Sequence, residues 1–198
     1  SKIINIGAAK AKELVDKFNV KSIDDLKKRN KSGEIPLNDK ILIGLKYYGK
    51  VQDNIPRKEI YNLYKVLKKI RDKIDENLIV KIAGSYRRQK DFSNDIDILL
   101  SHPDIITPDD NKKSDIDYLN TFIGLLKKKK YIIDDLTDGI IGTKYMGFSK
   151  YGSNPVRRID IRFVPFQSYY TALLYFTGSY EFNRDMRLVA KTLGYKLN

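Results

Sequence analysis

Two short apolar segments, joined by a glycine-serine turn, constrain the fold of this chain more than any other feature. Residues 78–83 and 95–100 are rich in Ile, Leu and Val and have the length of buried strands. A Gly-Ser turn at residues 84–85 and an arginine pair at residues 87–88 lie between them. The sequence therefore predicts one continuous unit of strand, turn, cations and strand.

Asp95 and Asp97 begin the second of these strands. Side chains two residues apart on a strand point to the same face, so the two carboxylates project together while Ile96 and Ile98 face the opposite layer. Two neighbouring carboxylates in an apolar strand repel each other and are costly to bury without cations. Hard oxygen ligands in this arrangement suit Mg²⁺ that arrives with phosphate groups.

The turn before the two aspartates has the chemistry of a phosphate cradle. Gly84 and Ser85 offer backbone N–H groups and a hydroxyl with no bulky side chain in the way. Arg87 and Arg88 add positive charge beside them. The pattern predicts an anion-binding turn next to the acidic pair.

A third carboxylate lies on a later segment with strand character. Residues 156–164 alternate apolar and polar side chains, and Pro165 ends the segment. Asp160 shares the polar face with Arg158 and Arg162. If this strand lies beside the first acidic strand, the three aspartates can hold two divalent ions. Such a site activates a hydroxyl and stabilises in-line phosphoryl or nucleotidyl transfer.

Other copies of these motifs favour ordinary structural roles. A second Asp-x-Asp, at residues 115–117, precedes a helical pattern, where carboxylates cap the first turn. A second Gly-Ser-Tyr, at residues 178–180, is typical of a turn followed by an N-cap. An isolated Asp-x-Asp is more often structural than catalytic, and only the continuous context distinguishes the copy at Asp95.

Composition limits the classes of function. The 198-residue chain carries 38 Lys and Arg against 25 Asp and Glu, a net charge of +13 that attracts polyanions. It has no cysteine, which excludes disulfides and thiolate sites, and its single histidine, His102, excludes a histidine cluster. His102 lies in a Ser-His-Pro-Asp stretch that predicts a surface turn. No segment has transmembrane length or the pattern of a secretory signal, so no membrane partner is predicted.

The periodicity of apolar residues predicts an α+β organisation. Short helical patterns separated by polar turns occupy roughly the first 55 residues. A helix with Pro56 in its first position has one apolar face and one basic face. After the strands of the acidic site, the sequence predicts a polar loop, a helix, irregular strands and two further helices: residues 107–114, 118–130, 132–133 with 145–148, 169–176 and 181–193.

Five stretches keep the order and spacing of a known family: residues 41–48, 55–59, 84–103, 157–162 and 174–179. Together they resemble the family X (polymerase beta-like) DNA polymerases. The resemblance implies a nucleotidyltransferase palm with a mixed β-sheet at residues 57–166. A small helical, DNA-binding helix-hairpin-helix subdomain at residues 1–56 would precede it, and an incomplete nucleotide-selecting helical subdomain at residues 167–198 would follow. An amino-terminal lyase domain and the extreme carboxy terminus would be missing.

The resemblance also implies roles for single residues. Asp95, Asp97 and Asp160 would be catalytic and would bind two Mg²⁺ ions, for which Mn²⁺ could substitute. The incoming nucleotide would be bound by Gly84, Ser85, Arg88, Tyr175, Phe176, Gly178 and Asn183. DNA would be contacted by Ile3, Ile6, Gly7, Arg158, Arg184 and Arg187, with a monovalent cation at the hairpin turn. Arg162 would act as a conformational switch, pairing with a metal-binding aspartate when the site is open.

The implied function is repair-type, template-directed addition of dNMP from dNTP to a primer 3′-hydroxyl. The implied partners are primer-template or gapped DNA and a dNTP, bound by a monomer inside the cell, in the nucleus or wherever the DNA is. Three residues depart from the family pattern: Asn54 replaces an arginine that faces the triphosphate, Asn94 replaces a glycine before the first aspartate, and Asn5 replaces the first glycine of the hairpin.

The residues alone leave alternatives open. Tyr175 and Phe176 are equally typical of core aromatics, and the polar residues of the last helix are equally typical of a solvated face. Two other functions fit the same motifs. One is a template-independent terminal or RNA-end nucleotidyltransferase, and the other is a non-catalytic DNA-binding fragment.

Overall fold

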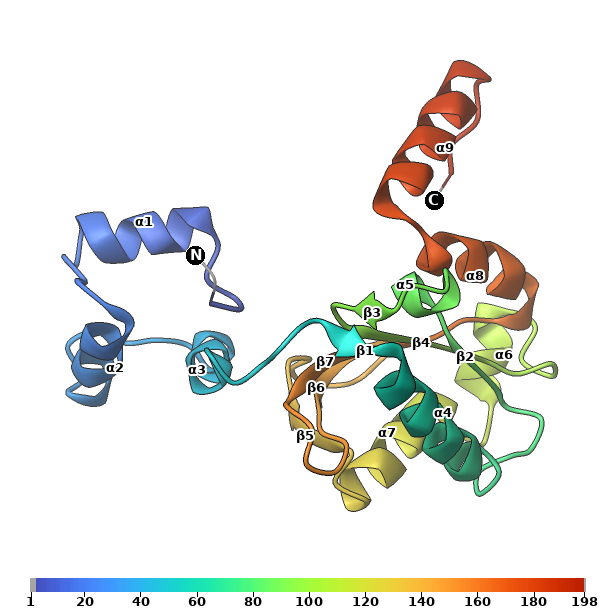
Figure 1. Cartoon of the computed structure of the whole chain (residues 1–198). Coiled ribbons are helices and arrows are strands. Elements are labelled where there is room, and N and C mark those ends of the chain that lie inside the picture. The colour runs from blue at the N-terminus through green and yellow to red at the C-terminus, as the bar shows by residue number, and fades with distance from the viewer. Residues whose placement is uncertain (1–2, 198) are drawn as a thin grey trace. The chain divides into compact units, whose positions relative to one another are not determined.

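The computed structural model describes residues 3–197, and the chain divides into two compact units, residues 1–51 and residues 52–198 (Figure 1). We call them the helical unit and the sheet unit. Each has its own cluster of buried apolar side chains. Among the helices in the described part of the chain, none combines the length and the apolar character needed to cross a membrane.

The helical unit consists of α1 (Ala8–Asp16), α2 (Ile23–Lys31) and α3 (Asp39–Tyr47). Its core contains one leucine from each helix: Leu14, Leu26 and Leu45. Ser22 caps α2, because its side chain accepts a hydrogen bond from the backbone N–H of Asp25. Asn38 caps α3 in the same way.

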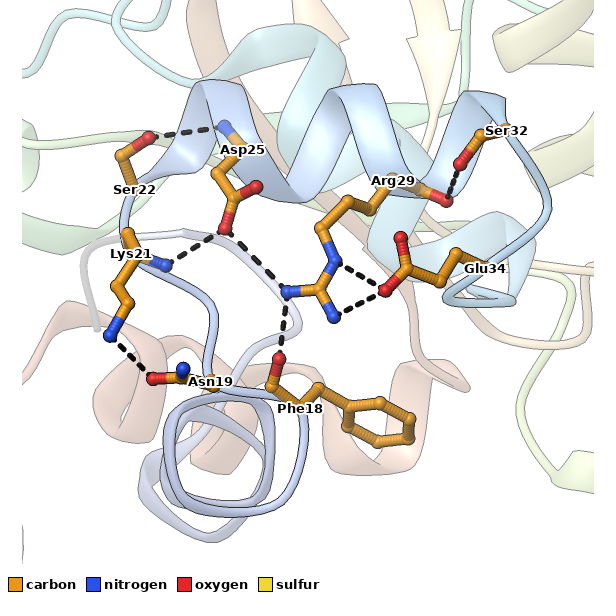
Figure 2. A network of polar contacts seen from close by, with 8 residues as sticks. All are labelled: Phe18, Asn19, Lys21, Ser22, Asp25, Arg29, Ser32 and Glu34. Atoms are coloured by element: carbon orange, nitrogen blue, oxygen red, sulfur yellow. Dashed lines mark hydrogen bonds and ion pairs between the residues drawn. The ribbon is translucent and has the colours of Figure 1, made fainter.

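A polar network centred on Arg29 ties α2 to the segments around it (Figure 2). The Arg29 guanidinium donates to Glu34 through Nε at 2.9 Å and lies 2.7 Å from the same oxygen through Nη2. Its Nη1 donates to the backbone oxygen of Phe18, just after α1, at 2.7 Å. One side chain thus connects the end of α1 with α2 and with the turn that follows it.

The sheet unit is built around a five-stranded mixed sheet in the order β2-β4-β7-β6-β5. Its strands are β2 (Ile79–Ile82), β4 (Ile96–Ser101), β5 (Ile132–Asp135), β6 (Lys144–Ser149) and β7 (Arg157–Phe163). The β4–β7 pair is parallel, and the other neighbours are antiparallel. A separate two-stranded sheet joins β1 (Ile55–Pro56) to β3 (Phe92–Ser93).

Helices pack on both faces of β4. Ile96 and Ile98 of β4 share a core with α4 (Arg57–Arg71) and α7 (Tyr118–Lys128). Leu99, on the opposite face, packs against α8 (Tyr169–Thr177). The remaining elements are α5 (Gly84–Arg87), α6 (Pro108–Lys113), η1 (Phe166–Ser168) and α9 (Tyr180–Thr192).

Two local predictions are corrected. Residues 107–114 were predicted to be a loop, but Thr107 and Asp110 form a reciprocal capping box that begins α6, with a proline in its first turn. Pro56 was predicted at the first helical position. It is the N-cap of α4 instead, since it pairs in β1 and the helix begins at Arg57.

The prediction of a surface turn at His102 was wrong. The residue is 2% exposed, and its Nε2 lies 2.9 Å from Oδ2 of Asp75. Its ring stacks on Tyr118 with 4.8 Å between the centroids. The Pro and Asp after it do form a turn, but His102 directly follows the last residue of β4, and its ring lies in the core before the turn begins.

Candidate active site

The two acidic strands are neighbours, which is the condition on which the predicted three-aspartate site depends. β4 and β7 run parallel, and the Cα atoms of Asp97 and Asp160 are direct partners in the register. Because Ile96 and Ile98 point into the core with α4 and α7, Asp97 faces the other side of the sheet. Asp95 lies directly before β4.

The three carboxylates influence one another. Burial raises the pKa of Asp97 to about 7, and the charges of Asp95 and Asp160 add to this rise. Burial and the charge of Asp160 also raise the pKa of Asp95. Arg162 and Arg88 act on Asp97 in the opposite direction without cancelling the rise in pKa. Burial and mutual repulsion therefore make it costly for all three carboxylates to be charged without a cation.

The donor chemistry of this cluster fits Mg²⁺, which prefers carboxylate oxygens. Within residues 3–197, however, no three carboxylate or imidazole side chains are gathered into a ready-made metal site. Oδ1 of Asp160 instead lies 2.8 Å from Nη2 of Arg158. An ion bound here would compete with Arg158 for Asp160.

The glycine-serine turn lies against the acidic cluster. Gly84 has a positive φ of +56°, and a Cβ atom at this position would collide with Oδ2 of Asp97. The Ser85 hydroxyl donates to the Ser93 hydroxyl at 2.8 Å. No sequence pattern indicates Ser93, because the two-residue strand β3 is too short to show a period.

The two arginines after the turn contact the end of α8. Nη1 of Arg88 donates to the backbone oxygen of Thr177 at 2.6 Å, and Nη1 of Arg87 donates to its side-chain oxygen at 3.0 Å. Gly178 follows with φ +71°, and a Cβ atom there would lie 3.0 Å from Nη1 of Arg88. Thr177 is a second contact that the sequence did not indicate.

Aromatic side chains at the end of α8 meet the cations of the site. Tyr175 is 42% exposed and makes an edge contact with Phe176, with 4.9 Å between centroids. The Arg162 guanidinium lies over the Phe176 ring at 4.7 Å. Among the described residues, Arg162 forms no ion pair with a carboxylate. A narrow hollow beside these groups is lined by side chains that include Asp97 and Asp160.

Two of the three residues predicted on α9 approach Tyr175. Nδ2 of Asn183 donates to the Tyr175 backbone oxygen at 2.7 Å, while its buried Oδ1 has no hydrogen-bond partner. The Arg187 guanidinium lies 5.1 Å from the Tyr175 ring centroid. Arg184 instead pairs with its exposed neighbour Asp185.

The residues predicted for the hairpin turn belong to the helical unit. The backbone N–H of Ile6 donates to the oxygen of Ile3 at 3.1 Å, and Gly7 is the N-cap of α1. Asn5 has φ +66°, a conformation that asparagine tolerates, and its Nδ2 donates to the backbone oxygen of Lys40 at 2.9 Å.

Comparison with known proteins gives matches along the chain. The family model for the DNA polymerase beta palm matches residues 54–166, and the model for the DNA polymerase beta thumb matches residues 172–198. The model for the fingers domain of DNA polymerase lambda matches residues 1–52.

Two curated relatives agree with these matches. DNA polymerase lambda of Arabidopsis thaliana is 30% identical over 203 residues, covering 98% of this chain and 36% of the relative. DNA polymerase lambda of Rattus norvegicus is 31% identical over 183 residues, covering 90% and 30%. The chain thus spans about a third of the length of the curated relatives it matches. Because the palm model alone covers more than half of its residues, the chain belongs to the DNA polymerase beta family, family X.

Proposed function

We propose that this chain catalyses template-directed addition of dNMP from a dNTP to a primer 3′-hydroxyl in primer-template or gapped DNA. One observation carries the proposal: the parallel β4–β7 register sets Asp97 beside Asp160, next to Asp95 and the Gly84 turn. The names of the relatives, DNA polymerase lambda, support a repair role. The functional parts would be a DNA-binding helical subdomain, a palm and a nucleotide-selecting subdomain, at residues 1–56, 57–166 and 167–198.

The acidic cluster would perform the chemistry. Asp95 and Asp97 would face the phosphates, and Asp160 would lie on the side of the primer 3′-hydroxyl and orient it. When bound to these carboxylates, two Mg²⁺ ions, or Mn²⁺ in their place, supply a lowered pKa for the hydroxyl and neutralise charge at the phosphorus. The raised pKa of Asp97 supports this assignment, because a buried carboxylate beside two others is stabilised in its charged form by a bound cation.

The nucleotide would bind along the turn and the end of α8. The backbone of Gly84 and Ser85 and the Arg88 guanidinium would hold the triphosphate. The Ser85 hydroxyl, which now donates to Ser93, would then donate to a phosphate oxygen instead. Tyr175, Phe176 and Gly178 would lie beside the sugar and disfavour a ribose 2′-hydroxyl. Asn183 would contact the minor-groove edge of the base through Nδ2, because that edge offers mainly acceptors. Nδ2 would then leave the Tyr175 backbone oxygen to which it now donates.

Contacts to DNA would involve both units. Ile3, Ile6 and Gly7 would present backbone groups to a DNA phosphate, with a monovalent cation at the turn. Arg158 would approach the primer, and Arg184 and Arg187 the template. Arg162 would change partner between Phe176 and Asp97 as the site opens and closes. The protein would act as a monomer inside the cell, where the DNA is.

The test is extension of a primer across a gap with Mg²⁺ and one dNTP at a time. Asp160→Asn should abolish extension while DNA binding persists. Asp115→Asn, in the exposed Asp-x-Asp before α7, removes the same charge outside the site and should leave extension unchanged. Extension by the Asp160 variant at the wild-type rate would refute the assignment. Incorporation that ignores the template base would indicate a terminal transferase instead.

A further inference from the structure

The outer face of α4 is strongly basic. The helix carries six cations, Arg57, Lys58, Lys65, Lys68, Lys69 and Arg71. Its one acid, Glu59, is buried and forms an ion pair with Arg157. Exposed side chains at positions 58, 61, 65 and 68 follow one line along the helix with spacings of three and four residues. We call Lys58, Tyr61, Lys65 and Lys68 the α4 stripe (the helix is teal in Figure 1).

Helix stability does not account for these charges. The macrodipole favours cations near the carboxyl end of a helix, which explains Lys68, but it disfavours Lys58 in the first turn. Lys65 also lies three and four residues from further lysines, spacings at which like charges repel. Among the described residues, no carboxylate pairs with any lysine of the α4 stripe. This uncompensated charge is complementary to a polyanion.

Aromatic rings accompany the charges. Nζ of Lys65 lies 4.4 Å from the centroid of the Tyr61 ring, which is 50% exposed. A hollow of about 520 Å³ is lined by Arg57, Lys58, Tyr61 and Tyr86. Unpaired bases stack on exposed aromatic rings while the phosphates follow the cations, whereas the bases of a duplex are already stacked. The combination favours a single strand over a duplex.

The α4 stripe is separate from the acidic cluster. The opposite side of α4, with Leu63 and Leu67, packs against the face of the sheet that carries Ile96 and Ile98, and Asp97 lies on the other face. The amino-terminal end of α4 nevertheless reaches the phosphate-binding turn. Nη1 of Arg57 donates to the backbone oxygen of Tyr86, at 2.5 Å.

We propose that the α4 stripe binds a single-stranded stretch of nucleic acid, with phosphates against its lysines and a base stacked on Tyr61. In the proposed function this strand would be an unpaired part of the DNA substrate, and that identification rests on the function. Binding itself needs neither catalysis nor a nucleotide. The α4 stripe would therefore hold unpaired DNA on the side of the sheet away from the reacting ends.

The test compares two double variants with the same change of charge. Lys58→Glu with Lys65→Glu alters the α4 stripe, and Lys128→Glu with Lys129→Glu alters exposed lysines at the end of α7. Binding of a labelled oligothymidylate is followed by fluorescence anisotropy over a range of salt concentrations, without Mg²⁺ or nucleotide. The α4 variant should bind more weakly. The slope of its log K against log salt concentration should become shallower by about 1 for each lost phosphate contact. The α7 variant should retain the wild-type slope.

The aromatic part is tested separately. Tyr61→Leu should weaken binding roughly tenfold or more, whereas Tyr61→Phe, which keeps a ring for stacking, should bind like the wild type. Photocrosslinking of an iododeoxyuridine oligonucleotide should mark the peptide that contains Tyr61. Thermal unfolding of each variant verifies that it is folded.

Several results would overturn the proposal. Equal losses in the two double variants would show that only net charge matters, and crosslinks confined to other peptides would exclude the α4 stripe. Stronger competition by duplex than by single-stranded DNA would exclude base stacking. Extension of a primer across a single-base gap, which leaves no unpaired overhang for the α4 stripe, is measured in parallel. If wild-type extension fails while binding still depends on the α4 stripe, only the proposed function is refuted. If extension succeeds but binding does not depend on the α4 stripe, only the role of the stripe is refuted.

Discussion

Gly84 lies so close to Asp97 that any side chain at position 84 would collide with the Asp97 carboxylate. The positive φ of Gly84 adds a second reason for glycine, since residues with a Cβ atom rarely adopt it. The turn that would bind phosphate can therefore approach the Asp97 carboxylate this closely only with glycine at position 84.

Gly84→Ala should displace the Asp97 carboxylate and reduce primer extension by about 100-fold, the effect of a misplacement of about 1 Å at a reacting centre. Gly124→Ala is the matched control, because Gly124 lies in α7 and a Cβ atom there meets nothing within 4 Å. The control should keep full activity and gain slightly in helix stability. Equal activity in the two variants would contradict the role of the close approach.

The stability of the metal-free protein should fall as pH rises from about 4 to about 7. The pKa of Asp97 is about 7 in the folded protein against 3.8 as its ordinary value, because burial and two neighbouring carboxylates oppose its charge. In this pH range the folded state binds a proton that the unfolded state has released, so deprotonation favours unfolding.

Thermal unfolding in EDTA at several pH values tests this relation. The wild type should lose stability relative to Asp97→Asn as pH rises, because the amide carries no charge. At neutral pH, Mg²⁺ should raise the melting temperature of the wild type and have less effect on the variant. Parallel pH curves for the two proteins would contradict the prediction.

The buried ion pair between Glu59 and Arg157 should be essential for stability. The pair is bidentate, with N–O distances of 3.0 and 2.8 Å, and Arg157 also donates to the backbone oxygens of Gln52 and Asp53. Glu59→Gln leaves a buried guanidinium without its counter-charge, which should lower the free energy of unfolding by about 3–5 kcal/mol.

Denaturant unfolding measures this loss. Asp72→Asn breaks the exposed pair with Arg71 and should change the free energy of unfolding by only about 0–1 kcal/mol. Replacement of both buried partners by Leu and Met should be less harmful than Glu59→Gln alone, because no unpaired charge remains. Similar losses for the Glu59 and Asp72 variants would show that burial is not decisive.

Arg29 should stabilise the helical unit through the network shown in Figure 2. Arg29→Met removes the contacts to Phe18, Asp25 and Glu34 and should lower the unfolding temperature of that unit. Lys28→Met, a neighbouring change of charge on α2, should have a smaller effect. Hydrogen exchange of amides in α2 would report the difference, and equal exchange in the two variants would contradict it.

The elements that define the site could be predicted because they are periodic. The strands around residues 79–82 and 96–101 are short and mostly apolar, and the strand at residues 157–163 alternates from Arg158 onward. These patterns predict both the type of each element and its buried face. The β4–β7 pairing was only a condition of the prediction, since no local pattern encodes which strands become neighbours.

Other parts of the site could not be predicted from periodicity. β1 and β3 have two residues each, too few to show a period, and with β3 the contact between Ser85 and Ser93 was missed. The ion pair between Arg158 and Asp160 depends on rotamers. His102 was misplaced because turn residues follow it, although the ring itself belongs to the strand end.

The parallel alignment of Asp97 with Asp160 has a consequence for folding. Parallel neighbours require a long crossover, and the entropy of closing that loop must be overcome before the strands can dock. Until β7 docks, the chain carries only an acidic pair like the one before α7, with nothing to complete it. Catalytic competence would then arrive with the finished tertiary structure, so a turnover measurement would also report whether the crossover has closed.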